Sequence, residues 1–360
     1  MAAHRVVHRR IALVVAGIAG VAAMSGCLYG PPYDQLLTGD EELLEIARRD
    51  YTSGRDRVAM AVIDGDEVRT AFVSADAATR FELGSATRGL TGLLFADAIE
   101  RGEVGIDDPV GTYLELGDAP AAALTLRDLA THHSGLPQQP LAPGAWEEPP
   151  GIDDGEGTGP DRGGLDVLLG RVGSIDLVPE LGYNASDFDA ALIGQALASA
   201  TGTRPADLLV ERVLSPAGMA DAVVVESADL LPDGLAQGRD VRGERVAPRG
   251  SGAYAPALGV VVTVDDAIAL ARALLDGPFA DSAALVPIAE TRWPQIAIGI
   301  FWERLAREGG DVVYIVGASE GFTAAVLVDQ DGDRAAVLLA NRTDRWPWSR
   351  LRPLIAAMGD

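Results

Sequence analysis

Strand-forming segments lie near both ends of this 360-residue chain, and helix-forming segments fill its middle. Two apolar runs, residues 58–63 and 68–73, flank Gly65-Asp66 and predict a β-hairpin. Towards the C-terminus, further strands are expected over residues 296–301, 312–316, 322–328 and 335–339, the last two joined by a turn over 329–333. This order indicates an α/β fold in which strands from both termini form the sheet and a mostly helical insertion separates them.

Helical periodicity characterises the middle of the chain. The segment from Ser85 to Arg101 reads as a helix, with Ser85 near its start and Gly102 just past its end. Residues 140–164 are rich in Pro, Gly, Asp and Glu and predict a long surface loop. Further helices are expected over residues 41–51, 124–130, 187–200, 205–214, 264–275 and 350–358.

The N-terminus resembles an export signal. A basic stretch, residues 4–10, precedes about 13 apolar residues, fewer than the roughly 20 that a spanning helix needs. Met24-Ser25-Gly26-Cys27 then resembles a bacterial lipoprotein box. We expect a signal peptide over 1–26, a lipid on Cys27, a tether over 27–40 and one domain over 41–360. The protein would then be anchored by lipid to the cell membrane, facing outside the cytoplasm. A plain secretory leader with an incidental Cys27 is the alternative.

Composition excludes several kinds of partner and chemistry. The net charge of −24 disfavours nucleic acid and anionic membrane surfaces, so membrane contact is expected through the lipid alone. Cys27 is the single cysteine, which rules out a disulfide within the chain. All 29 basic residues are arginine, and the only histidines beyond the leader are His132 and His133. We expect neither a metal site nor a cofactor.

Several stretches in a fixed order resemble the serine β-lactamase and penicillin-binding family, especially class C β-lactamases and their esterase relatives. They are FELGSATRGLTGLLFADAIERGEVGIDDPV (81–110), TLRDLATHHSGLP (125–137), YNASDFDAALIGQALASATG (183–202), GVVVTVDDAIALARALL (259–275) and YIVGASEGFTAAVLVD (314–329). The resemblance implies a β-lactamase/transpeptidase-like fold, an antiparallel sheet flanked by helices with a mostly helical insertion. It also implies an acyl-enzyme formed on serine, with small esters, amides or peptidoglycan-like molecules as substrates.

The family motifs are incomplete in this chain. Ser85 matches the nucleophile of Ser-x-x-Lys, but Arg88 stands in place of the lysine. Tyr183 matches the tyrosine of Tyr-x-Asn, but Ala185 stands in place of the asparagine. A third motif, Lys-Thr-Gly or His-x-Gly, binds the substrate carboxylate. Here Ile315 replaces its first residue, Gly317 matches the glycine, and Ala318 would supply an oxyanion N–H beside that of Ser85.

Arg88 cannot act as the base. Arginine has a pKa of about 12.5–13.8, so neutralising it at pH 7 would cost roughly 7–9 kcal/mol. One hypothesis still allows catalysis. Arg88 lowers the pKa of Tyr183, and the Tyr183 phenolate then takes the proton of Ser85. Ile315 removes the polar group near the substrate acid, which predicts poor recognition of penicillins and a preference for neutral esters. A different arginine could take the place of the missing polar group and bind the substrate acid.

Other serine and metal arrangements fit less well. Ser319 lies in a Gly-x-Ser-x-Gly pattern, but that pattern needs a following helix and a later histidine, which this sequence lacks. His133-Ser134 are adjacent, which is not by itself a reactive geometry. Asp329, Asp331 and Asp333 read as a hairpin turn rather than a calcium loop. Two functions stay open: a weak, esterase-like serine hydrolase, or a catalytically disabled relative that binds cell-envelope material.

Overall fold

The computed structural model describes residues 35–52, 56–138, 162–344 and 351–359. The chain divides into two units, residues 1–35 and 36–360, and everything below concerns the second. Cys27, the signal peptide and most of the expected loop over 140–164 lie outside the described residues. Within the described ranges, no helix is both long and apolar enough to cross a membrane.

One antiparallel sheet contains strands from both ends of the chain, as predicted. Its order is β1 (Leu37–Gly39), β3 (Glu67–Val73), β2 (Val58–Asp64), β12 (Arg334–Ala340), β11 (Thr323–Asp329), β10 (Val312–Ala318), β9 (Glu303–Leu305), β8 (Ile296–Ile298) and β7 (Ala289–Glu290). The N-terminal hairpin joins the C-terminal strands where β2 pairs with β12, from Val58 opposite Ala340 to Asp64 opposite Arg334. The expected hairpin at Gly65-Asp66 is confirmed.

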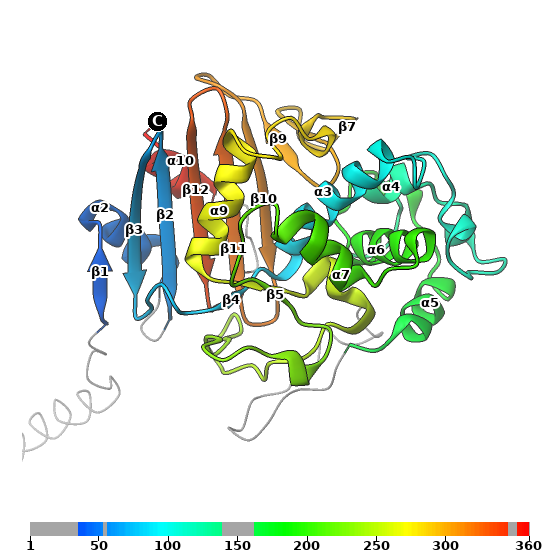
Figure 1. The fold of residues 1–360 in the computed structure, drawn as a ribbon, viewed down its shortest axis with the longest axis horizontal. Coiled ribbons are helices and arrows are strands. Elements are labelled where there is room, and N and C mark those ends of the chain that lie inside the picture. The colour runs from blue at the N-terminus through cyan, green and yellow to red at the C-terminus, as the bar shows by residue number, and fades with distance from the viewer. Residues whose placement is uncertain (1–34, 53–55, 139–161, 345–350, 360) are drawn as a thin grey trace, which may run out of the picture. The chain divides into compact units, whose positions relative to one another are not determined.

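The two faces of this sheet are buried by different helices. Successive side chains of a strand point to opposite faces. In β2, Val58, Met60 and Val62 join the apolar cluster that includes α2 (Glu41–Ile46) and α10 (Leu351–Ala357). The alternate side chains face the cluster that includes α9 (Val264–Leu275) and α3 (Thr87–Glu100). Figure 1 shows α9 in front of the strands and α10 behind them.

The middle of the chain forms the predicted helical insertion. It contains α4 (Leu126–Ala130), α5 (Leu165–Gly173), α6 (Asp187–Thr201), α7 (Pro205–Leu209) and α8 (Ala255–Leu258). A second sheet, β4 (Phe81–Glu82), β6 (Val260–Val262) and β5 (Val223–Val224), connects it to the main body. α3 contacts α6 and α8, and its Gly89 lies against Ile315 of β10, so the helix is buried along most of its length.

The structure departs most from the sequence expectation at residues 296–301 and in the predicted tether. The apolar run over 296–301 is not one strand: β8 ends at Ile298, Phe301 has a φ of 63°, and β9 returns from Glu303. The buried side chains of Ile300 and Phe301 pack in the helical core, so their apolar character serves packing rather than strand pairing. The sheet also begins inside the predicted tether, because Leu37–Gly39 pairs with β3.

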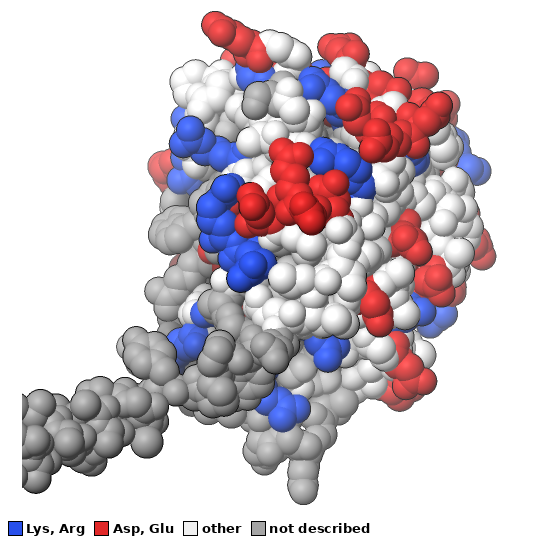
Figure 2. Space-filling model, turned by 90° about the vertical axis from the view of Figure 1, so that its left-hand side faces the viewer, with Lys and Arg blue, Asp and Glu red and all other residues white. Residues whose placement is uncertain are grey.

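The surface around β1 and α2 carries mixed charge (Figure 2). Arg69 on β3 pairs with Asp40 and Glu42, which precede and begin α2. On this face a group of acidic side chains lies between two groups of basic side chains.

Candidate functional site

Ser85 lies on a short 3-10 turn, Gly84–Ala86, between β4 and α3. The sequence placed it at a helix start, and the α-helix itself begins two residues later at Thr87. Its hydroxyl does not cap the helix; instead Ser85 Oγ accepts a hydrogen bond from the Ala318 amide at 3.1 Å. The structure therefore brings together the two residues that the family motif assigns to the nucleophile and to the oxyanion site.

Two glycines allow this close approach between the turn and β10. Gly84 has a φ of +53°, which disfavours any residue with a side chain. A Cβ on Gly317 would lie 1.9 Å from the Ala86 nitrogen, where no atom fits. The Gly317 position of the third motif is thus explained by packing of the strand against the Ser85 turn.

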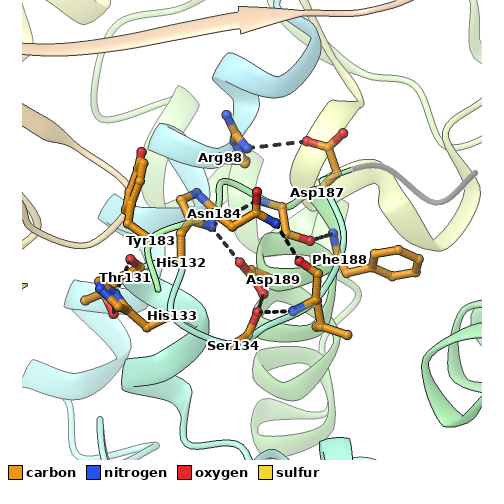
Figure 3. A network of polar contacts seen from close by, with 12 residues as sticks. Arg88, Thr131, His132, His133, Ser134, Tyr183, Asn184, Asp187, Phe188 and Asp189 are labelled. Atoms are coloured by element: carbon orange, nitrogen blue, oxygen red, sulfur yellow. Dashed lines mark hydrogen bonds and ion pairs between the residues drawn. The ribbon is translucent and has the colours of Figure 1, made fainter. Parts of the chain in front are cut away.

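Arg88 is a buried cation with two fixed contacts. Its Nε donates to the backbone oxygen of Ser85 at 2.8 Å, and its Nη1 lies 3.6 Å from Asp187 Oδ1 (Figure 3). Only 7% of the Arg88 side chain and 4% of the Asp187 side chain are exposed. The guanidinium therefore holds the Ser85 turn from its backbone side and does not contact Ser85 Oγ.

Asp187 is a functional candidate that the sequence reasoning missed. That reasoning looked for an amide at residue 185, where Ala185 is buried and apolar. The residue that reaches Arg88 is instead Asp187, the first residue of α6, which follows the N-cap Ser186. A carboxylate at the start of a helix, two residues past the expected position, was the available signal.

Tyr183 is buried, and its hydroxyl is hydrogen-bonded to a carboxylate. Its hydroxyl donates to Glu303 on β9, and Tyr314 is paired with Glu303 across β9 and β10. Burial and the Glu303 charge raise the pKa of Tyr183 well above 10, against the smaller opposing effects of Arg88 and Arg292. The expectation that Arg88 brings this pKa below its ordinary value is wrong, because desolvation and Glu303 outweigh the guanidinium.

Arg88 is also the shared counter-charge of a wider buried cluster. Burial raises the pKa of Asp187, Asp189 and Glu303, and the Arg88 charge opposes the rise at each of them. Burial lowers the pKa of His132 well below 6.5, with Arg88 and His133 adding to that effect. One guanidinium therefore lies close to three buried carboxyl groups and one buried imidazole.

The two histidines, His132 and His133, have different hydrogen-bond partners. His132 Nδ1 lies 2.6 Å from Asp189 Oδ2, and Ser134 Oγ donates to Asp189 Oδ1 at 2.6 Å (Figure 3). His133 Nδ1 instead lies 2.8 Å from the Thr131 backbone oxygen. Ser134 and His133 thus bond to different partners and do not form the Ser–His pair considered from the sequence.

The structure gives each remaining candidate from the sequence a structural explanation. Ile315 is 5% exposed and belongs to the core cluster beside α3. Ser319 is followed by strand β11 and not by a helix, so it is no nucleophile elbow. Asp329 is buried between Arg307 and Arg334, at 3.2 and 2.9 Å. Among the described residues, no group of three or more His, Cys, Asp or Glu side chains is arranged to hold a metal ion.

Among the described residues, Ser85 Oγ accepts from one backbone amide, and no side chain that could act as a base is hydrogen-bonded to it. In the described part of the chain, the Ala318 amide is the one polar group hydrogen-bonded to Ser85 Oγ. The Arg88 side chain reaches only the Ser85 backbone, and the phenol of Tyr183 is bonded to Glu303. Such a site can stabilise a tetrahedral oxyanion without assisting proton removal.

Comparison with known proteins agrees with this fold. The family model for beta-lactamase matches residues 45–359. A class C beta-lactamase from Rhodobacter sphaeroides is similar in structure, with a TM-score of 0.66 and 22% identity over 84% of this chain and 94% of that one. A second class C beta-lactamase aligns with a TM-score of 0.71 and 16% identity over 89% of this chain and 95% of that one. At these identities the two structures support the fold alone.

Proposed function

Because the chain belongs to the beta-lactamase family, we propose that it is a serine hydrolase in which Ser85 forms an acyl-enzyme slowly, with neutral esters that carry a good leaving group. The observation that carries this proposal is the 3.1 Å contact between Ser85 Oγ and the Ala318 amide. It keeps the nucleophile beside the group that would stabilise the developing oxyanion.

The reaction would proceed without a dedicated base. Ser85 Oγ forms a bond to the ester carbonyl carbon, the carbonyl oxygen takes the negative charge, and the N–H groups of Ser85 and Ala318 stabilise it. The bond to the leaving alkoxide then breaks, and the serine proton passes to solvent or to that alkoxide. General base assistance contributes typically 10²–10⁴-fold, so we expect turnover to be slower than in a complete site by about that factor.

The substrate preference follows from Ile315. An apolar, buried side chain stands where the family presents a polar or cationic group. A substrate carboxylate placed there would lose its hydration without gaining a partner. Neutral esters are therefore the favoured class, ahead of penicillins and D-alanyl peptides.

Covalent labelling tests the proposal. A fluorophosphonate probe should label the wild type at Ser85 and should not label Ser85→Ala. If the two proteins behave alike, Ser85 is not a nucleophile. Arg88→Lys provides a second measurement, because a lysine can lose its proton on burial whereas arginine cannot. An increase in hydrolysis of p-nitrophenyl acetate by Arg88→Lys would support a cleft that lacks only the base.

A catalytically disabled binding protein is the second candidate. The Arg88–Asp187 pair and the Tyr183–Glu303 bond favour it, because both engage the residues that stand at the positions of the family's lysine and tyrosine. In that case the cleft would hold a peptidoglycan-like fragment. Wild type and Ser85→Ala would then bind a muropeptide equally in calorimetry, and neither would react with the fluorophosphonate.

The location outside the cytoplasm is part of the same proposal. It depends on the sequence of residues 1–26 as a signal peptide, lipid attachment at Cys27, a tether over 27–40 and the domain over 41–360. Metabolic labelling with an alkyne fatty acid should modify the wild type in a bacterial host. Cys27→Ser should remain unmodified; equal labelling of both proteins would contradict the anchor.

A further inference from the structure

A cavity of about 210 Å³ lies beside the Ser85 turn. Two segments next to the nucleophile line it: Glu82 on β4 lies three residues before Ser85, and Ser319 follows Ala318 directly. Other parts of its wall come from the C-terminal end of α8, from β6, and from two loop segments within residues 231–238 and 246–251. Nothing in the proposed acyl transfer uses this cavity.

The polar part of the wall is an arginine–glutamate–arginine cluster. Arg249 Nη2 lies 3.1 Å from Glu320 Oε2, and Arg162 Nη2 lies 3.5 Å from Glu320 Oε1. The two arginine side chains are about four-fifths buried, with 20% and 18% exposed. A guanidinium has five N–H donors, so one bond to Glu320 does not use up the capacity of either arginine.

The charge balance of the cavity favours an anion. Burial raises the pKa of Glu82, against the opposing effects of the Ser319 hydroxyl, Arg162 and Arg249. The guanidinium groups of Arg162 and Arg249 both face the carboxylate of Glu320, and the raised pKa of Glu82 disfavours a second negative charge beside them.

The turn that carries Ser319 and Glu320 is held from both sides. The Ser319 amide donates to the Phe322 backbone oxygen at 3.0 Å, and Thr343 Oγ1 donates to the Ser319 backbone oxygen at 2.8 Å. The Arg239 amide donates to the Gly321 backbone oxygen at 3.1 Å. Bonds of this kind place the polar end of the cavity before any ligand arrives, which reduces the ordering that binding requires.

Apolar side chains form most of the remaining wall. They include Leu235, Val246, Leu258 and Phe322. A concave, mainly apolar wall with a few convergent polar groups is typical of small-molecule sites. An occupant of this cavity would have an apolar body and one charged end.

We propose that this cavity binds a small organic monocarboxylate, with its carboxylate on Arg249 and Arg162 and its apolar part against Leu235 and Phe322. Planar guanidinium groups bind carboxylates through paired N–H donors. The site is distinct from the position of the missing family cation. Ile315 lies within β10 and Ser319 follows its last residue, so the two are four residues apart, at most about 13 Å at 3.3 Å per residue. The proposal does not require the Ser85 hydroxyl.

The test uses calorimetry on the Ser85→Ala protein, so that binding is measured without acylation. Phenylacetate should bind at least about tenfold more tightly than phenylacetamide, its neutral analogue, because only the carboxylate gains charge-assisted bonds. Arg249→Gln should weaken phenylacetate binding by about tenfold or more. Arg242→Gln removes the same charge from an exposed position outside the cavity wall, and its binding should match that of the parent.

Glu320→Gln tests whether the arginines, and not Glu320, hold the ligand. Removing the carboxylate frees the arginines, so phenylacetate should bind more tightly. Weaker binding to Glu320→Gln, or equal binding of the acid and the amide, would overturn the proposal. If the fluorophosphonate does not label Ser85, the carboxylate-binding proposal still stands. If phenylacetate does not bind, the acyl-enzyme proposal still stands.

Discussion

Arg88 Nη1 lies 3.6 Å from Asp187 Oδ1, inside a region where both side chains are almost completely buried. The pair joins the first turn of α3 to the first turn of α6, so it links the start of α3, next to Ser85, to the helical insertion. A permanently charged residue in the position of the family lysine therefore has a carboxylate partner of its own. Its role in the fold can be measured separately from any role in chemistry.

Replacing Arg88 by methionine should strongly destabilise the protein. Breaking a buried ion pair typically costs about 3–5 kcal/mol, because the remaining charge is left without compensation. Arg88→Met should lose more stability than Asp187→Asn, since the guanidinium also lies near Asp189 and Glu303. Urea unfolding followed by circular dichroism measures both. The matched control is Arg101→Met, whose exposed pair with Asp97 should contribute about 0.3–0.5 kcal/mol. Equal losses in Arg88→Met and Arg101→Met would contradict the assignment.

Tyr183→Phe should leave the reaction of Ser85 nearly unchanged. Tyr183 is a neutral phenol at pH 7 because its pKa is raised, so it provides no phenolate to lose. We expect the fluorophosphonate labelling rate to change by less than about threefold, whereas loss of a base costs 10²–10⁴-fold. The same change removes a donor from buried Glu303 and should cost about 1–3 kcal/mol of stability.

Tyr314→Phe is the control for the tyrosine experiment, since Tyr314 is the phenol paired with Glu303 across β9 and β10. Similar stability losses in the two variants, with similar labelling rates, would indicate that both phenols serve the carboxylate. A hundredfold slower labelling of Tyr183→Phe alone would restore the phenol as a participant in proton transfer.

Glu82→Gln should stabilise the protein more at pH 7 than at pH 4. Burial raises the pKa of Glu82 in the folded state above its unfolded value of about 4.3. The folded protein then binds more protons than the unfolded chain above that pH, so the contribution of Glu82 to stability falls as the pH rises. The slope is at most about 1.4 kcal/mol per pH unit for one group. Urea unfolding at pH 4, 5.5 and 7 would measure it, and a pH-independent difference between wild type and variant would contradict the raised pKa.

Ile315 predicts the ranking of substrates. We expect measurable, Ser85-dependent hydrolysis of p-nitrophenyl acetate and no detectable cleavage of a chromogenic cephalosporin, because the cephalosporin carboxylate would meet an apolar side chain. Spectrophotometric assays at equal enzyme concentration give both rates. Efficient cephalosporin cleavage by the wild type would mean that another cation takes the place of the missing one.

Local patterns in the sequence were sufficient for most of the fold. The two apolar runs over residues 58–63 and 68–73 around Gly65-Asp66 predicted the first hairpin, because strand-forming composition and turn chemistry are local properties. The same reasoning found the strands over 312–316, 322–328 and 335–339, and the helix after Ser85. It failed at residues 296–301, where an apolar run fills the core under α3 around a turn at Phe301. Apolar residues needed for packing and for strand pairing look alike in a short segment.

The sequence by itself determined the chemical character of the site: a serine at the start of a helix, and a cation beside it that cannot accept a proton. Only the tertiary structure decided what those groups touch. Asp187 lies 99 positions beyond Arg88, and Glu303 lies 120 positions beyond Tyr183. The direction of the Tyr183 pKa depended on burial and on that distant carboxylate. Residue identity is a local property, whereas desolvation and charge pairing depend on which distant segments the fold brings together.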